Sequence, residues 1–181
     1  MKNTLSRSIT NFENLENKFS EAVTSDSYKK LIELFKKHED IYVIGNGGLH
    51  YVASHMATDI SRLVPDKYCH SFDSFGFITS SANDFGFDTI FERWIDVCVN
   101  TSNRKGLIIG LSCSGTSKNI VNAFEYGKKI GWDVFLVSGR PTNLSVPHIE
   151  IGAKHFHTVE VFCLMLFYEI IHSLGHSCPE I

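Results

Sequence analysis

Short apolar runs alternate with longer amphipathic segments from residue 41 onward, and this alternation constrains the fold more than any other feature. The clearest runs are IYVIG at 41–45, GLIIGLS at 106–112 and DVFLVSG at 133–139, with weaker runs KYCHSF at 67–72 and HIEIG at 148–152. Apolar runs separated by helical segments are typical of parallel strands covered by helices on both faces. The pattern predicts an α/β fold with a doubly wound, three-layer parallel sheet of about five strands.

The amphipathic segments predict helices over residues 49–63, 88–99, 117–130 and 158–174. The first forty residues also have helical spacing, with Ser25 or Asp26 as the N-cap of their second helix. We therefore expect a single domain over residues 1–181, with an N-terminal helical segment at 1–40 and an α/β core at 41–181. The apolar faces of the terminal helices predict packing between subunits.

Composition excludes several classes of protein. Of the 181 residues 20% are charged, and the net charge of −3 makes a nucleic-acid-binding surface a poor expectation. The N-terminus has no apolar core of a signal peptide, and VFCLMLFY at 161–168 is too short to span a membrane, so it predicts a buried helix. The five cysteines are dispersed without a CxxC pair, which favours reduced thiols. We expect a soluble cytoplasmic protein without a membrane partner.

A glycine-rich loop, GNGG at 45–48, follows the first strand and precedes a helix. Glycine permits a positive φ and close approach of a ligand to the backbone, and the start of a helix attracts anions. The dinucleotide fingerprint is broken because His50 stands where its third glycine would fall, and no Walker lysine is present, so no nucleotide cofactor is expected. A plain structural turn remains the alternative for this loop.

A second loop, SCSGTS at 112–117, is richer in hydroxyl groups. Hydroxyls and a glycine at a helix N-terminus form a neutral cradle suited to a phosphate monoester. Ordinary N-capping would need only one of these hydroxyls. The loop therefore favours phosphate binding.

With both loops considered, the sequence resembles the SIS (sugar isomerase) domain and, within it, the phosphoheptose isomerases. The matching stretches are VIGNGG, HMATD followed by Arg62, ANDFGFDTIFERWI and GLSCSGTSKNIVNAFEYGKKIG. The resemblance implies isomerisation of sedoheptulose 7-phosphate to a heptose 7-phosphate for surface polysaccharide, and an SIS-type flavodoxin-like fold. It also implies a homotetramer with active sites shared between subunits, and a zinc cofactor.

The resemblance also implies roles for individual residues. His55 takes the place of a metal-binding histidine, and Asp59 that of a glutamate that acts as base or metal ligand. Cys113 stands where the family usually has threonine. The residues expected to bind the phosphosugar are Asn46, Gly47, Gly48, Asp84, Ser112, Cys113, Ser114, Thr116 and Ser117.

The chain departs from the family pattern in three places. Leu49 replaces a serine, and Asp59 is one methylene shorter than the family's glutamate. The last helix lacks the family's glutamine and, eight residues later, histidine; the best registers here pair Glu160 with Tyr168, or Val159 with Phe167. A rebuilt zinc site of His55, Asp59, His157 and Glu160 is one expectation, since these ligand types suit zinc. The alternative is that His155 and His157 are ordinary polar residues near a helix start.

The sequence therefore predicts a phosphosugar aldose–ketose isomerase with Asp59 and Glu160 as catalytic residues. Tyr168 could donate a proton, although a tyrosine in an apolar helix more often packs in the core. Two alternatives remain open. The first is a sugar-phosphate-binding or protein-interaction domain without catalysis, and the second is an isomerase of another phosphosugar.

Overall fold

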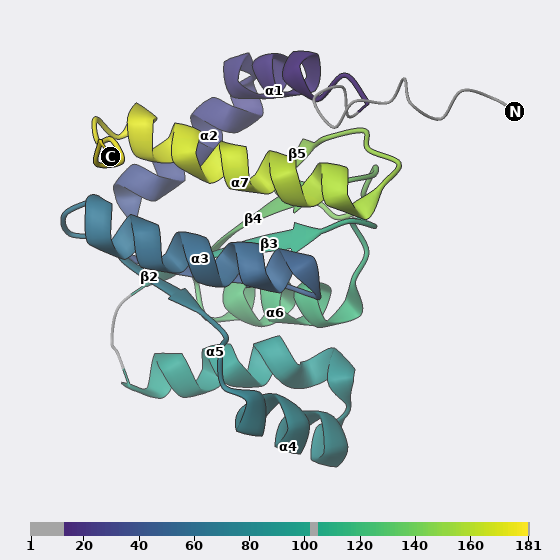
Figure 1. Cartoon of the computed structure of the whole chain (residues 1–181). Helices are drawn as coiled ribbons and strands as arrows, with labels where there is room; N and C mark the ends of the chain where they lie inside the picture. Colours follow the sequence, from purple (N-terminus) through teal and green to yellow (C-terminus); the bar gives the residue numbers. More distant parts are fainter. Residues whose placement is uncertain (1–12, 102–104, 181) are drawn as a thin grey trace, which may run out of the picture.

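The computed structural model describes residues 13–101 and 105–180, and its centre is a parallel sheet of five strands in the order β2-β1-β3-β4-β5 (Figure 1). The order is that of the flavodoxin-like doubly wound sheet, so the predicted fold class is confirmed. Residues 1–12 of the predicted N-terminal segment lie outside the described residues. The strands are β1 (Asp40–Gly45), β2 (Tyr68–Ser71), β3 (Gly106–Ser112), β4 (Asp133–Ser138) and β5 (His148–Glu150).

Helices surround this sheet: α1 (Leu15–Thr24), α2 (Asp26–Lys37), α3 (Gly48–Leu63), α4 (Phe75–Phe85), the short 3₁₀ helix η3 (Phe87–Thr89), α5 (Ile90–Thr101), α6 (Lys118–Lys129) and α7 (Phe156–Ser173). Ser25 caps α2 as predicted, because its side chain accepts a hydrogen bond from the Tyr28 amide at 3.1 Å. Helix α4 was not predicted. Its sequence, FGFITSSANDF, is rich in residues of low helix propensity, so local preference did not reveal it.

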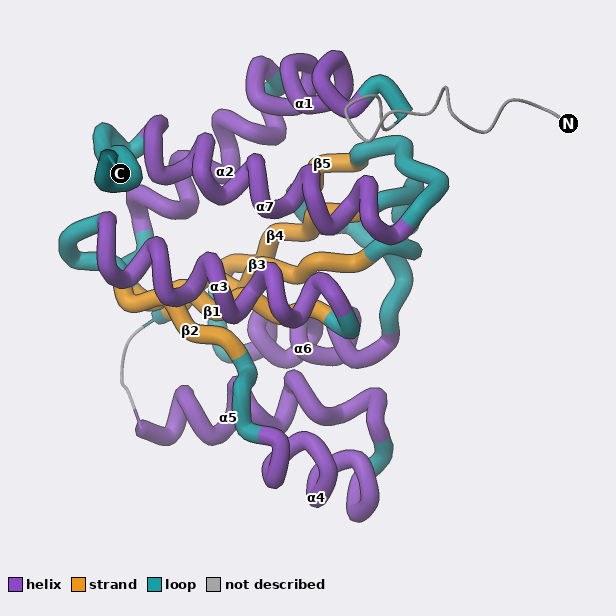
Figure 2. Tube along the Cα trace, in the orientation of Figure 1, coloured by secondary structure: helices purple, strands orange, loops and turns teal. Residues whose placement is uncertain are grey.

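The helices form two layers on opposite faces of the sheet (Figures 1 and 2). Helices α1, α2, α3 and α7 bury their apolar residues in one core cluster, and α5 and α6 bury theirs in a second. Strands β1, β3 and β4 contribute to both clusters, since successive side chains point to opposite faces. Continuous apolar strands are therefore required, and β1 and β3 are buried along their whole length.

Helix α7 belongs to the first of these layers. Its length and hydropathy would suffice for a membrane span, yet Phe162, Cys163, Leu166 and Ile170 are fully buried. The ring of Phe19 on α1 packs edge-on against Phe162 at 5.6 Å. One face of the helix is thus buried in the protein core, which agrees in part with the buried helix that the sequence predicted.

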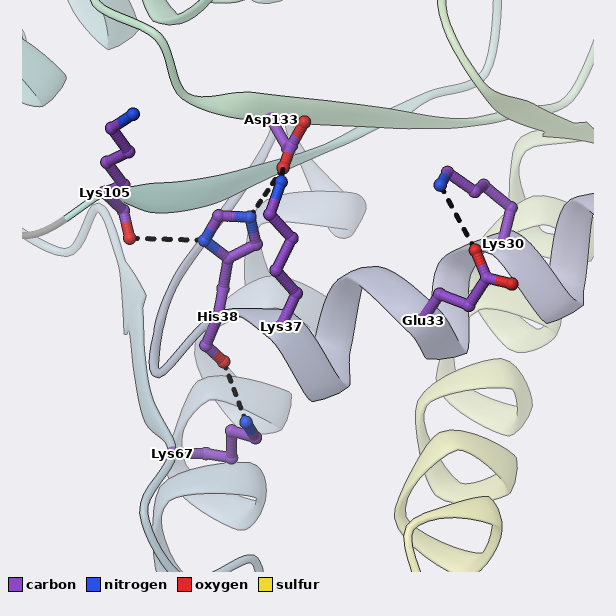
Figure 3. Close-up of polar contacts among 7 residues, drawn as sticks. All are labelled: Lys30, Glu33, Lys37, His38, Lys67, Lys105 and Asp133. Atoms are coloured by element: carbon purple, nitrogen blue, oxygen red, sulfur yellow. Dashed lines mark hydrogen bonds and ion pairs between the residues drawn. The ribbon is translucent and has the colours of Figure 1, made fainter.

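A polar cluster joins four segments at the amino ends of the strands (Figure 3). The buried His38 ring has Nε2 at 2.7 Å from the Asp133 carboxylate and Nδ1 at 3.2 Å from the Lys105 carbonyl. Lys37 also reaches Asp133 at 2.6 Å, and Lys67 donates to the His38 carbonyl at 2.8 Å. Burial would raise the pKa of Asp133, but hydrogen bonds from Lys37 and His38 lower it. The cluster ties the end of α2 to β3 and β4.

We expect His38→Ala to lower the free energy of unfolding by about 2 kcal/mol, because it removes a buried side chain together with its hydrogen bonds to Asp133 and to the Lys105 carbonyl. Urea denaturation of the variant and of the wild type measures this difference. Lys30→Ala is the matched control, since the Lys30–Glu33 pair in Figure 3 is exposed and should contribute little. Equal stability of His38→Ala and wild type would contradict the role assigned to the cluster.

Candidate functional site

The two polar loops meet at the carboxyl edge of the sheet. Strands β1 and β3 are neighbours, with Gly45 paired to Leu111, so the loops that follow them lie side by side. They enclose a pocket of about 380 Å³, which we call the serine pocket. It is lined by Asn46, Gly47, Gly48, Leu49, Leu111, Ser112, Cys113, Ser114, Ser117, Phe156 and Glu160. This is the position at which doubly wound sheets bind ligands.

The serine loop is organised by its own hydroxyl groups. The Ser112 oxygen accepts a hydrogen bond from the Gly115 amide at 3.1 Å and lies 3.0 Å from the Ser117 hydroxyl. The Ser114 oxygen accepts from the Thr116 amide at 3.2 Å and from its hydroxyl at 3.3 Å. Gly115 has a φ of 73°, a conformation that favours glycine. The hydroxyls are therefore held in one place before any ligand arrives, which reduces the entropy lost on binding.

Asn119 is a site residue that the sequence reasoning missed. Its side chain is 2% exposed and forms reciprocal amide hydrogen bonds with Asn46, at 2.9 and 3.1 Å. The pair joins the glycine loop to the first turn of α6. A polar residue in the first turn of a helix gave no signal of this role, because its partner lies 73 positions away.

The Glu160 carboxylate lies against Gly48 at the start of α3. A Cβ atom added at Gly48 would stand 2.2 Å from Glu160 Oε1, so only glycine leaves room for the carboxylate there. Burial raises the pKa of the Cys113 thiol, and the negative charge of Glu160 raises it further. Among the described residues that line the serine pocket, Glu160 is the only acidic residue, and none is a lysine, arginine or histidine.

Asp59 lies in a different place, at the other end of α3. Its carboxylate oxygens take hydrogen bonds from Arg62 at 3.0 Å and from the Tyr168 hydroxyl at 3.2 Å. His55 Nε2 lies 3.0 Å from the Tyr168 oxygen and 3.6 Å from Asp59. Asp59 is eleven residues beyond Gly48 on α3, so the helix rise separates them by about 16 Å. We call His55, Asp59, Arg62 and Tyr168 the Asp59 cluster.

The four predicted zinc ligands are not brought together within one chain. His55 and Asp59 are neighbours, but Glu160 lies at Gly48, and the His157 ring stacks on His155. In the part of the chain that the structure describes, no group of three His, Cys, Asp or Glu side chains is arranged to hold a metal. One chain thus does not fit the predicted four-ligand site. A zinc site using His55 and Asp59 would need ligands from a second copy.

Asp84 also lies outside the serine pocket. It is exposed near the end of α4, where it accepts a hydrogen bond from Asn83 at 2.8 Å. The sequence placed it at the sugar, but Asp84 is not among the residues that line the serine pocket, and α4 packs on α5 and η3. Tyr168 stands at the edge of the core, and burial followed by the nearby Asp59 charge raises its pKa.

The start of α7, which carries Phe156 and Glu160 into the pocket, is capped by a residue distant in sequence. The Glu13 carboxylate accepts hydrogen bonds from the backbone amides of Lys154 and His155, at 2.7 and 3.1 Å, and from the Thr158 hydroxyl at 3.2 Å. It also contacts the His155 ring. Burial would raise the pKa of Glu13, but these hydrogen bonds prevail and lower it to about 2.

We expect the stabilising effect of Glu13 to depend on pH in a defined direction. Because its pKa in the folded protein is about 2, below the ordinary 4.5, its contribution is complete above pH 4.5 and is lost as the pH falls toward 2. Urea unfolding of wild type and Glu13→Gln at several pH values measures this. The stability gap should be largest at neutral pH and should narrow in acid. A gap that widened below pH 4 would contradict the capping role.

The architecture and the hydroxyl-lined pocket define an SIS-like α/β protein. A phosphoheptose isomerase from Neisseria gonorrhoeae superposes on the chain with a TM-score of 0.75 at 17% identity, covering 90% of this chain and 92% of that one. No protein-family model matches the chain.

Curated relatives give the family. The phosphoheptose isomerase of Vibrio vulnificus is 30% identical over 139 residues, which are 71% of this chain and 69% of the relative. That of Histophilus somni is 24% identical over 153 residues, covering 75% of this chain and 77% of the relative. The chain belongs to the phosphoheptose isomerase family of SIS-domain proteins, as a distant member.

Proposed function

We propose that this protein is an aldose–ketose isomerase that converts sedoheptulose 7-phosphate to a heptose 7-phosphate in the cytoplasm, for surface polysaccharide. The observation that carries the proposal is the serine pocket, in which a preformed hydroxyl cradle and one carboxylate, Glu160, face the same space. Family membership supports the reaction type, and the names of the relatives support the substrate.

The chemistry requires a base beside the carbon acid and hydrogen-bond donors for the developing oxyanion. In this proposal the serine loop anchors the phosphate, and Glu160 removes the proton from the carbon next to the carbonyl group. The oxygen of the original carbonyl group takes up a proton from solvent to give the enediol. The same carboxylate then returns its proton to the neighbouring carbon while the other enediol hydroxyl releases its proton to solvent, which completes the aldose–ketose exchange. Asn46 is fixed by Asn119 at the pocket wall, where it can bind a sugar hydroxyl.

We expect Glu160→Gln to lower kcat by about a hundredfold or more, because general acid–base catalysis typically contributes that much. Proton NMR of sedoheptulose 7-phosphate in deuterated buffer, with zinc and with a chelator, follows both product and deuterium incorporation at the isomerised carbon. Inorganic phosphate should still bind the variant, since its serine loop is intact.

Gly48→Ala provides a second test of the same carboxylate. The added methyl group displaces the flexible end of Glu160 rather than backbone, so the fold should persist while turnover falls. Full turnover and deuterium exchange in both variants would refute Glu160 as the base. If folded wild-type protein binds phosphosugars but does not convert them, the protein is a binding domain and not an isomerase. If it converts only another phosphosugar, the reaction type stands and the proposed substrate is wrong.

In this proposal the Asp59 cluster has a role only when a second copy of the chain is present. Its separation of about 16 Å from Gly48 exceeds the reach of one bound phosphosugar, so we propose that Asp59 of one subunit acts at the serine pocket of another. This would give Asp59 the catalytic or metal-binding role that its sequence position implies. A homotetramer with shared sites is the corresponding assembly.

We expect Asp59→Asn and Glu160→Gln to be inactive separately and to regain activity when co-expressed in one oligomer. A shared site can combine the intact Asp59 of one subunit with the intact Glu160 of another, whereas a site within one chain cannot. The activity of the purified mixed oligomer, relative to each variant alone, is the measurement. Two outcomes would contradict sharing: full activity of Asp59→Asn, or mixed oligomers without activity.

A further inference from the structure

A second, smaller hollow adjoins the serine pocket. It has a volume of about 180 Å³, and it shares Cys113, Ser114 and Phe156 with the serine pocket. Its other lining residues are Arg140, Ala153, Lys154, His155 and Val159. The hollow lies at the serine loop, between the chain that follows β4 and the chain that enters α7.

The two spaces differ in charge. The serine pocket has Glu160 as its ionised group, so it offers no compensation for a phosphate dianion. The small hollow contains Arg140 and Lys154, while the His155 ring contacts the Glu13 carboxylate. A dianion beside Ser114 would be attracted toward the cationic side and repelled from Glu160. The charges thus favour one orientation for a ligand that occupies both spaces, with its negatively charged end directed away from Glu160.

We propose that Arg140 and Lys154 bind the phosphate group of the ligand at the junction of the two spaces, with the sugar extending through the serine pocket toward Glu160. Neither residue is among those that the sequence assigned to the site. The proposal rests on the proposed function only in taking a phosphosugar as the ligand.

The size of the hollow agrees with this assignment. A volume of about 180 Å³ accommodates a phosphate group, and it is less than half the volume of the serine pocket. The larger serine pocket, at about 380 Å³, is left for the polyol chain. This orientation brings the end of the sugar remote from the phosphate near Glu160, where isomerisation of the first two carbons would occur.

The test uses Arg140→Gln, Lys154→Gln and the double variant of the full-length protein. Both side chains are exposed, and the Lys154 amide that binds Glu13 belongs to the backbone, so the fold should be retained; circular dichroism checks this. Calorimetric titration with inorganic phosphate should show a Kd raised about tenfold or more in the double variant. For the phosphosugar, KM should rise by a similar factor with kcat nearly unchanged, since ground-state and transition-state binding are lost together.

Lys118→Gln is the matched control. It removes one positive charge close to the serine loop, but Lys118 is exposed, lies 3.7 Å from Asp88, and lines neither space. Its Kd for phosphate should stay within about twofold of wild type, because Lys118 lines neither space and its charge lies beside the Asp88 carboxylate. Unchanged phosphate affinity in the double variant, or an equal loss in Lys118→Gln, would overturn the assignment.

Phosphate titration also separates this inference from the proposed function. A double variant that loses phosphate affinity supports the inference even where wild type shows no isomerisation, which would refute the proposed function alone. Normal isomerisation with a phosphate affinity independent of Arg140 and Lys154 would refute the inference alone.

Discussion

The rest of the structure depends on burial of a parallel sheet on both of its faces. Strands β1, β3 and β4 present apolar side chains to each face, so helices must cover both sides, and the connections that carry those helices make the strands run in one direction. All carboxyl ends then lie along one edge. The glycine loop and the serine loop meet there because β1 and β3 are paired. The first residues of the two loops, Gly45 and Ser112, are 67 positions apart in the sequence.

Helix α7 links this edge to the remainder of the first layer. Its first turns carry Phe156 and Glu160 to the serine pocket, and Tyr168, further along, contacts Asp59 on α3. At its far end, Ser173 hydrogen-bonds Tyr28 of α2 at 2.8 Å. Because one rigid helix holds both polar regions, their separation is set by the helix rise and cannot close by side-chain rotation. This geometry is the reason that one chain does not unite the residues that the resemblance places in one site.

Local sequence was sufficient where local physics decides the outcome. The five strands follow from apolar runs, the cap of α2 follows from Ser25, and the serine loop follows from hydroxyls at a helix start. It was insufficient for α4, whose weak propensity is overridden by packing on α5. It also missed Asn119, because its reciprocal bonds to Asn46 depend on two strands lying side by side.

The sequence by itself determined the fold class, the order of strands and helices, the two polar loops and the family resemblance. These are encoded in periodicity and in short motifs, which act over a few residues. Only the tertiary structure decided that Glu160 shares the serine pocket, that Asp59 and His55 lie with Tyr168 elsewhere, and that Glu13 caps α7. Such contacts join residues more than a hundred positions apart, and their distances depend on how the helices pack against the sheet.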